Sequence, residues 1–185
     1  MAVLVGTEPW PAMLRGIWGD MDRYRDTYWS HFAEQGYYFA GDGAKWDSDG
    51  ALWVLGRVDD VMNISGHRIS TSEVESALVG HEAVAEAAVV GASDEQTGQA
   101  IVAYVILREH HIGSGDELVD ALKAAVSKEI SPIAKPRDIT VVPELPKTRS
   151  GKIMRRLLRD LAEGREVGDT STLSDPSIME ALQKK

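Results

Sequence analysis

The chain has 185 residues, 43% of them hydrophobic and 26% charged, which is typical of a soluble globular protein with one sizeable domain or two small ones. It has no cysteine, no apolar run near the ~20 residues of a membrane helix and no signal-peptide pattern, so we expect a cytoplasmic protein without disulfides, thiolate metal sites or membrane contact. The net charge of −9 argues against general binding to nucleic acid.

Aromatic residues divide the chain in two. All five Trp, both Phe and four of the five Tyr precede residue 54, and only Tyr104 follows it. This change in composition predicts a boundary near "GRVDD", Gly56–Asp60. We expect residues 1–58 to be the last, β-rich piece of a large domain, and residues 59–185 to form a small, separate domain.

Short extended segments are predicted on both sides of this boundary. "ALWVLG", residues 51–56, reads as a strand after the turn-forming sequence "WDSDG". "VMNISGHRIS" reads as two extended pieces around Ser65 and Gly66. A tight hairpin turn is the simplest explanation of that glycine.

The next elements alternate between helix and strand. Ser70 and Glu73 have capping-box spacing, so a helix is expected to begin there and to end at Gly80. "AEAAVVG" and "AIVAYVILR" predict two strands joined by the polar loop "ASDEQTGQ".

The remaining elements complete an α/β domain. Apolar residues at helical spacing predict a helix over residues 115–130, "DITVV" predicts a strand, and a second apolar stripe predicts a helix from Lys152 to Gly164. The mostly polar tail "GDTSTLSDPSIMEALQKK", residues 168–185, is expected to wrap the surface. Helices covering a few strands define the fold class as α/β (α+β).

The segment "LPKTRSGKIMRR", residues 145–156, concentrates five cations in twelve residues. Residues 135–159 carry a local charge of +6, so the remainder of the chain sums to −15. Lys152 follows the flexible pair Ser150–Gly151 at the expected start of a helix, where backbone N–H groups favour anions. Such a lysine could stabilise charge on a phosphate or carboxylate. The alternative is a solvated lysine in a basic cluster.

Further candidates precede this segment. The carboxylate of Asp42 could accept hydrogen bonds from both hydroxyls of a ribose, and the planar donors of Arg57 could bind the same group. Gly66 would allow close approach of a ligand, and Arg68 could hold a phosphate. A turn, a surface ion pair and a hairpin are the structural alternatives.

The order of these motifs resembles that of a known family. "YFAGD", "GRVDDVMNISGHRIS", "SEVESAL", "PKTRSGKIMRRLLR" and "GDTSTLSDP" resemble the AMP-forming acyl-CoA synthetases of the adenylate-forming superfamily, and most closely the acetyl-CoA synthetases or their propionyl relatives. The resemblance covers nearly the whole chain. It implies the mobile C-terminal domain of such an enzyme, preceded by the end of its large AMP-binding domain.

The resemblance implies two half-reactions, in which acetate and ATP with Mg²⁺ give acetyl-AMP and pyrophosphate, and CoA then displaces AMP. It implies that Lys152 is the adenylation lysine, that Asp42 and Arg57 bind the ribose, and that Asp59 is the hinge between the domains. It also implies that Arg68 contacts a phosphate and that Ser65 and Gly66 lie beside the pantetheine channel.

The same resemblance implies a cation site and a regulatory site. The cation would be bound by Val79, His81 and Val84. Lys152 would also be a site of reversible N6-acetylation, so that an acetyltransferase and a deacetylase would be protein partners.

The sequence also departs from the family. Ser127 occupies the position where an arginine often faces the CoA phosphate, with Lys128 beside it and Lys123 one turn earlier. The family's phosphate loop, adenine pocket and acyl pocket have no counterpart, so we expect an incomplete, inactive part of an acetate–CoA ligase. A propionyl- or other short-chain acyl-CoA synthetase, an interaction module for an acetyltransferase, and a basic helix that binds nucleic acid are the alternatives.

Overall fold

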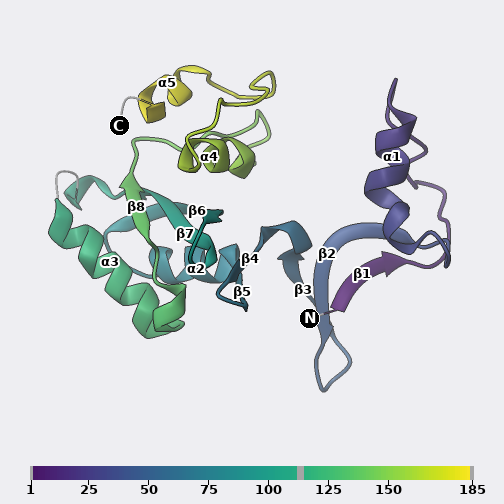
Figure 1. Ribbon diagram of the computed structural model, residues 1–185, viewed down its shortest axis with the longest axis horizontal. Helices are drawn as coiled ribbons and strands as arrows, with labels where there is room; N and C mark the ends of the chain where they lie inside the picture. Colours follow the sequence, from purple (N-terminus) through teal and green to yellow (C-terminus); the bar gives the residue numbers. More distant parts are fainter. Residues whose placement is uncertain (1, 112–114, 184–185) are drawn as a thin grey trace. The chain divides into compact units, whose positions relative to one another are not determined.

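A computed structural model describes residues 2–111 and 115–183 of the chain, except the side chains of residues 55 and 59. The chain divides into two compact units, Met1–Asp59 and Asp60–Lys185 (Figure 1). Each unit is described by itself. Within the described ranges, no helix combines the length and the apolar character that a membrane crossing requires.

The first unit contains a three-stranded antiparallel sheet in the order β1-β2-β3. Its strands are β1 (Ala2–Gly6), β2 (Tyr38–Trp46) and β3 (Leu52–Arg57), and a helix, α1 (Met21–Tyr28), lies between β1 and β2 in sequence. Several aromatic residues of this unit contact Tyr38, whose ring stacks on one tyrosine and meets two tryptophans edge-on. The strand expected over residues 51–56 is therefore present as β3 of this small sheet, and aromatic residues cluster around Tyr38 of β2.

The second unit is built on a five-stranded sheet. Its strands are β4 (Val61–Ile64), β5 (His67–Ser70), β6 (Val84–Asp94), β7 (Gly98–Leu107) and β8 (Asp138–Val141). The order is β5-β4-β7-β6, and β8 pairs with β7 in the parallel sense. All five strands contain segments that the sequence predicted as extended.

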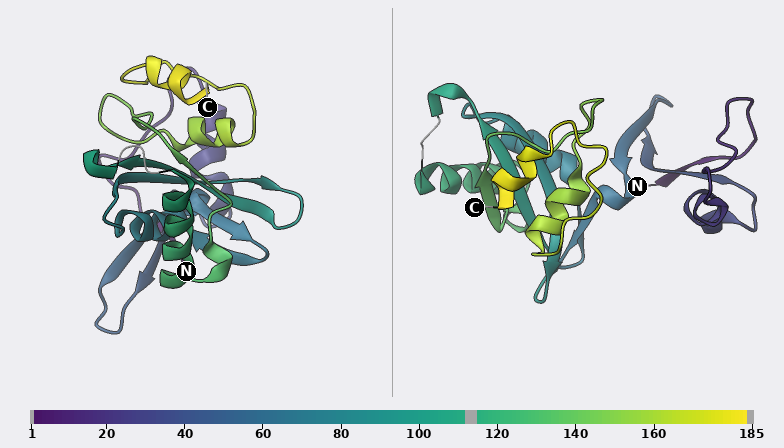
Figure 2. Two further views of the ribbon diagram at one scale, coloured as in Figure 1. Left: turned by 90° about the vertical axis from the view of Figure 1, so that its left-hand side faces the viewer. Right: turned by 90° about the horizontal axis from the view of Figure 1, so that it is seen from above.

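Helices cover both faces of this sheet (Figures 1 and 2). Because side chains alternate along a strand, β6 and β7 send one set to each face. Val89 and Ala103 pack in a core with α2 (Thr71–Val79) and α3 (Asp116–Glu129). Val90 and Val102 pack in a second core with α4 (Arg155–Ala162) and α5 (Ser177–Gln183). The α/β fold class is therefore confirmed, with three layers.

Three local expectations are wrong. The Ser70 side chain makes no capping bond and instead meets the Ser72 hydroxyl at 2.7 Å, so the predicted capping box does not form. The strands on both sides of the loop predicted at 92–99 continue to Asp94 and from Gly98, which leaves only a tight turn. The polar tail does not simply wrap the surface, because its few apolar residues are buried in the second core: Leu173, Ile178, Met179 and Leu182.

The buried phenol of Tyr104 makes the stability of this domain sensitive to alkaline pH. Burial raises its pKa to about 12, with a further contribution from the charge of Asp138, and its hydroxyl donates to the Leu158 carbonyl at 3.1 Å. In the unfolded chain the phenol ionises near pH ~10. The unfolded state therefore loses its proton first, and stability present below pH ~10 falls as the pH rises to about 12.

We expect this fall to be about 2–3 kcal/mol in the free energy of unfolding, measured by urea titration at about pH 9 and about pH 12. Tyr104→Phe should lose about 1 kcal/mol at the lower pH, because a hydrogen bond is removed, but should show a smaller alkaline fall than the parent. Equal falls in the two proteins would contradict the assignment.

Candidate functional site

Asp42 and Arg57 are brought together by the first sheet. They are direct partners across β2 and β3, so their side chains leave the same face. The Arg57 guanidinium lies against the backbone of Gly41, where an added Cβ would stand 2.8 Å from Nη2. Gly41 also has a φ of +80°, so glycine is required there for conformation and for space. Asp42 and Arg57 are therefore cross-strand neighbours, and the Arg57 guanidinium extends to the backbone of Gly41.

Ser65 and Gly66 form the two-residue turn between β4 and β5. Their φ values of 50° and 83° are both positive, as in a type I′ hairpin turn. The Ser65 N–H donates to the Thr97 carbonyl at 2.9 Å, which fixes the turn against the β6–β7 hairpin. Apart from Gly66 and its two chain neighbours, no heavy atom of the described residues lies within 4 Å of a Cβ placed on Gly66, so the turn presents bare backbone to open space. Arg68 follows on β5, with an exposed side chain.

Lys152 lies on a second hairpin, which extends from Lys147 to Ile153. These two residues form a β-bridge. Within the hairpin, the Thr148 N–H donates to the Lys152 carbonyl at 2.8 Å, and the Lys152 N–H donates to the Thr148 hydroxyl at 3.1 Å. The Gly151 N–H closes the turn on the Thr148 carbonyl at 2.8 Å. The backbone under Lys152 is therefore ordered, while its side chain is exposed.

This geometry corrects one expectation about Lys152. Helix α4 begins only at Arg155, so Lys152 is not at a helix N-terminus, and the anion-binding amides of a first turn are not adjacent to it. The Ser150–Gly151 pair lies within a hydrogen-bonded turn. The reach of the ammonium group comes from the long side chain, and its position comes from the fixed hairpin.

Most of the basic residues around Lys152 are engaged in contacts. Arg155 forms three hydrogen bonds of 2.8–3.0 Å with the Glu75 carboxylate. Lys147 pairs with Glu86 at 2.7 Å. Arg156 donates to the Asp169 carbonyl. Within residues 2–111 and 115–183, the ammonium group of Lys152 takes part in no hydrogen bond or ion pair, so its charge is available to a ligand.

The proposed cation ligands lie where α2 ends. The Val79 carbonyl is among the last carbonyls of this helix, which carry partial negative charge. The Nδ1 atom of His81 accepts the Ala83 N–H at 3.2 Å, so only Nε2 could face a metal. Val84 begins β6 and is fully buried. These donors fit a cation held mainly by carbonyl oxygens. Among the described residues, no cluster of three His, Cys, Asp or Glu could bind a metal.

The residues around Ser127 do not form a single cationic site. Lys123 donates to the Arg137 carbonyl at 2.6 Å, whereas Lys128 is exposed at the end of α3.

Sequence reasoning missed a hollow beside the Ser65 turn, and the basic run "AKPRD" was its one signal. It is lined in part by Thr97, Lys135 and Arg137.

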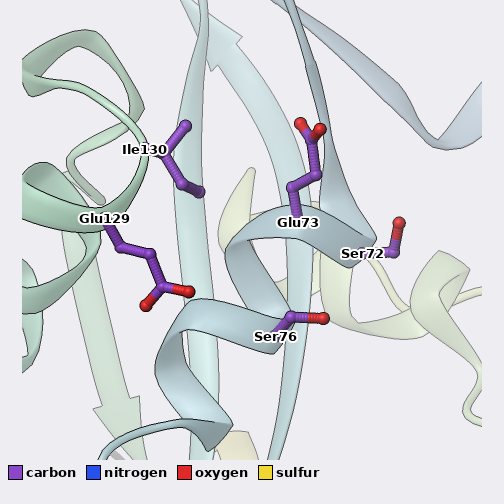
Figure 3. Close-up of a pocket in the computed structure, with 5 residues that line it drawn as sticks. All are labelled: Ser72, Glu73, Ser76, Glu129 and Ile130. Atoms are coloured by element: carbon purple, nitrogen blue, oxygen red, sulfur yellow. The ribbon is translucent and has the colours of Figure 1, made fainter.

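Another hollow lies between α2 and the end of α3 (Figure 3). It contains none of the predicted site residues. It is lined by two carboxylates, two hydroxyls and one apolar side chain: Glu73, Glu129, Ser72, Ser76 and Ile130.

Comparison with known proteins shows what the chain is similar to. Residues 73–152 match the family model of the AMP-binding enzyme C-terminal domain. Over 97% of its length the chain is 73% identical to the acetyl-coenzyme A synthetase of Mycolicibacterium smegmatis. It covers 19% of that protein and 28% of the acetyl-coenzyme A synthetase of Mycobacterium bovis, with which it is 66% identical.

A solved structure is also similar to this chain. An acyl-CoA synthetase from Brucella canis is 48% identical with a TM-score of 0.54, and the match covers 68% of this chain and 23% of that one.

Proposed function

We propose that this chain is the C-terminal part of an AMP-forming acetyl-CoA synthetase. In the first half-reaction, an acetate oxygen attacks the α-phosphorus of ATP and pyrophosphate leaves. In the second, the sulfur of CoA attacks the carbonyl carbon of acetyl-AMP, AMP leaves, and the thiol proton passes to solvent. The observation that carries the proposal is an exposed Lys152 on a hydrogen-bonded hairpin, without a side-chain partner among the described residues, in a chain 73% identical to a protein of that name.

The geometry supports the proposed roles. The Lys152 ammonium would bridge acetate and the phosphates of ATP during adenylation, because a fixed backbone with a free charge is preorganised to stabilise developing negative charge. Asp42 and Arg57, adjacent on one sheet face, would hold the ribose. The bare backbone of Gly66 would flank the channel for the pantetheine thiol, together with Ser65.

Because the two half-reactions use different groups, the proposal requires a domain that moves. Residues 1–58 would belong to the large domain and residues 59–185 to the mobile one. Asp59 is the proposed hinge; its side chain lies outside the described part of the structure. Lys152 would be presented in the first half-reaction and withdrawn in the second. Arg68 would contact a phosphate, and Lys128, exposed at the end of α3, is a better candidate than Lys123 for the CoA phosphate.

Magnesium would bind with ATP, neutralising phosphate charge. A separate cation would be held by the Val79 and Val84 carbonyls and by Nε2 of His81. An acetyltransferase and a deacetylase acting on Lys152 are the proposed protein partners, and such an enzyme system would be cytoplasmic.

A chimera tests the function. The matching residues of the M. smegmatis relative would be replaced by this chain, and both half-reactions would be assayed. The chimera should retain both activities, whereas the isolated chain should show no ATP–pyrophosphate exchange, because positioning of ATP contributes on the order of 7–11 kcal/mol. A folded but inactive chimera would refute the proposed function. ATP–pyrophosphate exchange by the isolated chain would refute the proposal that this chain is an incomplete part of the enzyme.

The role of Gly66 gives a separate prediction in the chimera. Gly66→Leu should spare adenylation and lower thioester formation, because the side chain would enter the open space beside the turn. Its φ of +83° strains any other residue, so Gly66→Ala is the matched control for backbone strain. Equal effects of Ala and Leu on thioester formation would show that strain, and not occlusion, is responsible.

A further inference from the structure

The base of the Lys152 hairpin also contacts residues near the end of the chain. Leu173 forms a β-bridge with Thr148. The next residue, Ser174, donates to the Lys147 carbonyl both from its N–H, at 2.9 Å, and from its hydroxyl, at 3.0 Å. Lys147 and Thr148 therefore lie between two partners, with Ile153 of the hairpin on one side and the tail on the other.

The tail, residues 168–183, is itself anchored in two ways. Asp160 of α4 accepts the Gly168 N–H at 3.3 Å and pairs with Arg165 at 3.0 Å, and so holds the start of the tail on the helix. Leu173 is 4% exposed and shares the second core with α5. A covalently distant segment is thus fixed to the domain and pairs with the hairpin.

These contacts form a continuous path to the lysine. Ser174 fixes the Lys147 carbonyl, the adjoining Thr148 amide fixes the Lys152 carbonyl, and the Thr148 hydroxyl fixes the Lys152 N–H. The place of the Lys152 Cα determines where the ammonium group can reach. Misplacement by ~1 Å can lower a rate ~10²-fold.

We infer that the tail positions Lys152 for adenylation, with Leu173 and Ser174 as positioning residues. The inference rests on the proposed role of Lys152. It assigns the tail a part in one half-reaction only, because the tail contacts the hairpin that carries Lys152, while the Ser65–Gly66 turn is fixed by the β6–β7 hairpin.

The first test measures structure in this chain without any activity. The double variant Leu173→Ala/Ser174→Ala removes the apolar anchor and the hydroxyl bond. Leu182→Ala is the matched control, since it truncates a leucine of the same core that is 9% exposed and lies outside the bridge. Hydrogen exchange of the Thr148 amide should become about tenfold faster in the double variant, after correction for global stability. Exchange no faster than in Leu182→Ala would overturn the inference.

The second test uses the chimera. The double variant should lower kcat for adenylation about tenfold or more and leave KM for ATP and the thioester half-reaction unchanged, whereas Leu182→Ala should leave both half-reactions unchanged. Equal loss in both half-reactions would overturn the inference. If Lys152→Ala blocks adenylation and the double variant does not, the positioning role alone fails. If Lys152→Ala has no effect, the proposed function fails instead.

Discussion

Replacing Lys152 by alanine in the chimera should lower the rate of adenylation by roughly 10²–10³, the usual effect of losing one preorganised electrostatic contact. Thioester formation from supplied acetyl-AMP should survive, because the proposed mechanism withdraws the lysine before that step. Separate assays of the two half-reactions decide the matter. An equal decrease in both rates would contradict a role confined to adenylation.

Acetylation of Lys152 should have the same effect, because it removes the charge. Lys147 offers an internal comparison: its ammonium is paired with Glu86 at 2.7 Å, whereas that of Lys152 is free among the described residues. Treatment of this chain with a lysine acetyltransferase and mapping by mass spectrometry should therefore label Lys152 before Lys147. Lys152→Arg is the control. Label that is distributed evenly, or is unchanged in the variant, would exclude a selective site.

The largest expected effect on stability is at Glu75. Its carboxylate binds Arg155 through three hydrogen bonds and accepts the Val89 N–H at 2.9 Å, at the outer edge of β6. The two side chains are 15% and 26% exposed. Glu75→Ala would leave a partly buried guanidinium and a backbone N–H without partners. We expect a cost of about 3 kcal/mol in the free energy of unfolding, near the lower end for a broken buried pair.

A double-mutant cycle checks this expectation by urea denaturation. Glu75→Ala/Arg155→Ala should be less destabilising than the sum of the two single variants, because the second change removes the unpaired charge. Glu75→Gln should lie between the parent and Glu75→Ala, since its amide oxygen can still accept the Val89 N–H. Simple additivity would show that the pair is not coupled. The pair joins α2 to α4 at the sheet edge, so its loss should also loosen the Lys152 hairpin.

The sequence predicted the regular elements well because their signals are local. Periodic apolar residues identified α3 and the long strands β6 and β7, and Ser65–Gly66 carried the chemistry of a two-residue turn. Errors had two causes. Ser70 had capping-box spacing, but its hydroxyl meets that of its near neighbour Ser72 instead. The sparse apolar residues of the tail gave no clear period, although the second core, formed by residues distant in sequence, buries them.

The candidate residues themselves were visible from the sequence, since glycines, carboxylates and lysines in a fixed order are readable without a structure. The sequence alone determined the residue types, the α/β class and the resemblance to adenylate-forming enzymes. Only the tertiary structure decided which charges are available. Arg155 and Lys147 look like Lys152 in the sequence, yet carboxylates from α2 and β6 neutralise them and leave Lys152 free. Charge pairing across the fold depends on distances between residues 61 and 80 positions apart, and no local pattern encodes those distances.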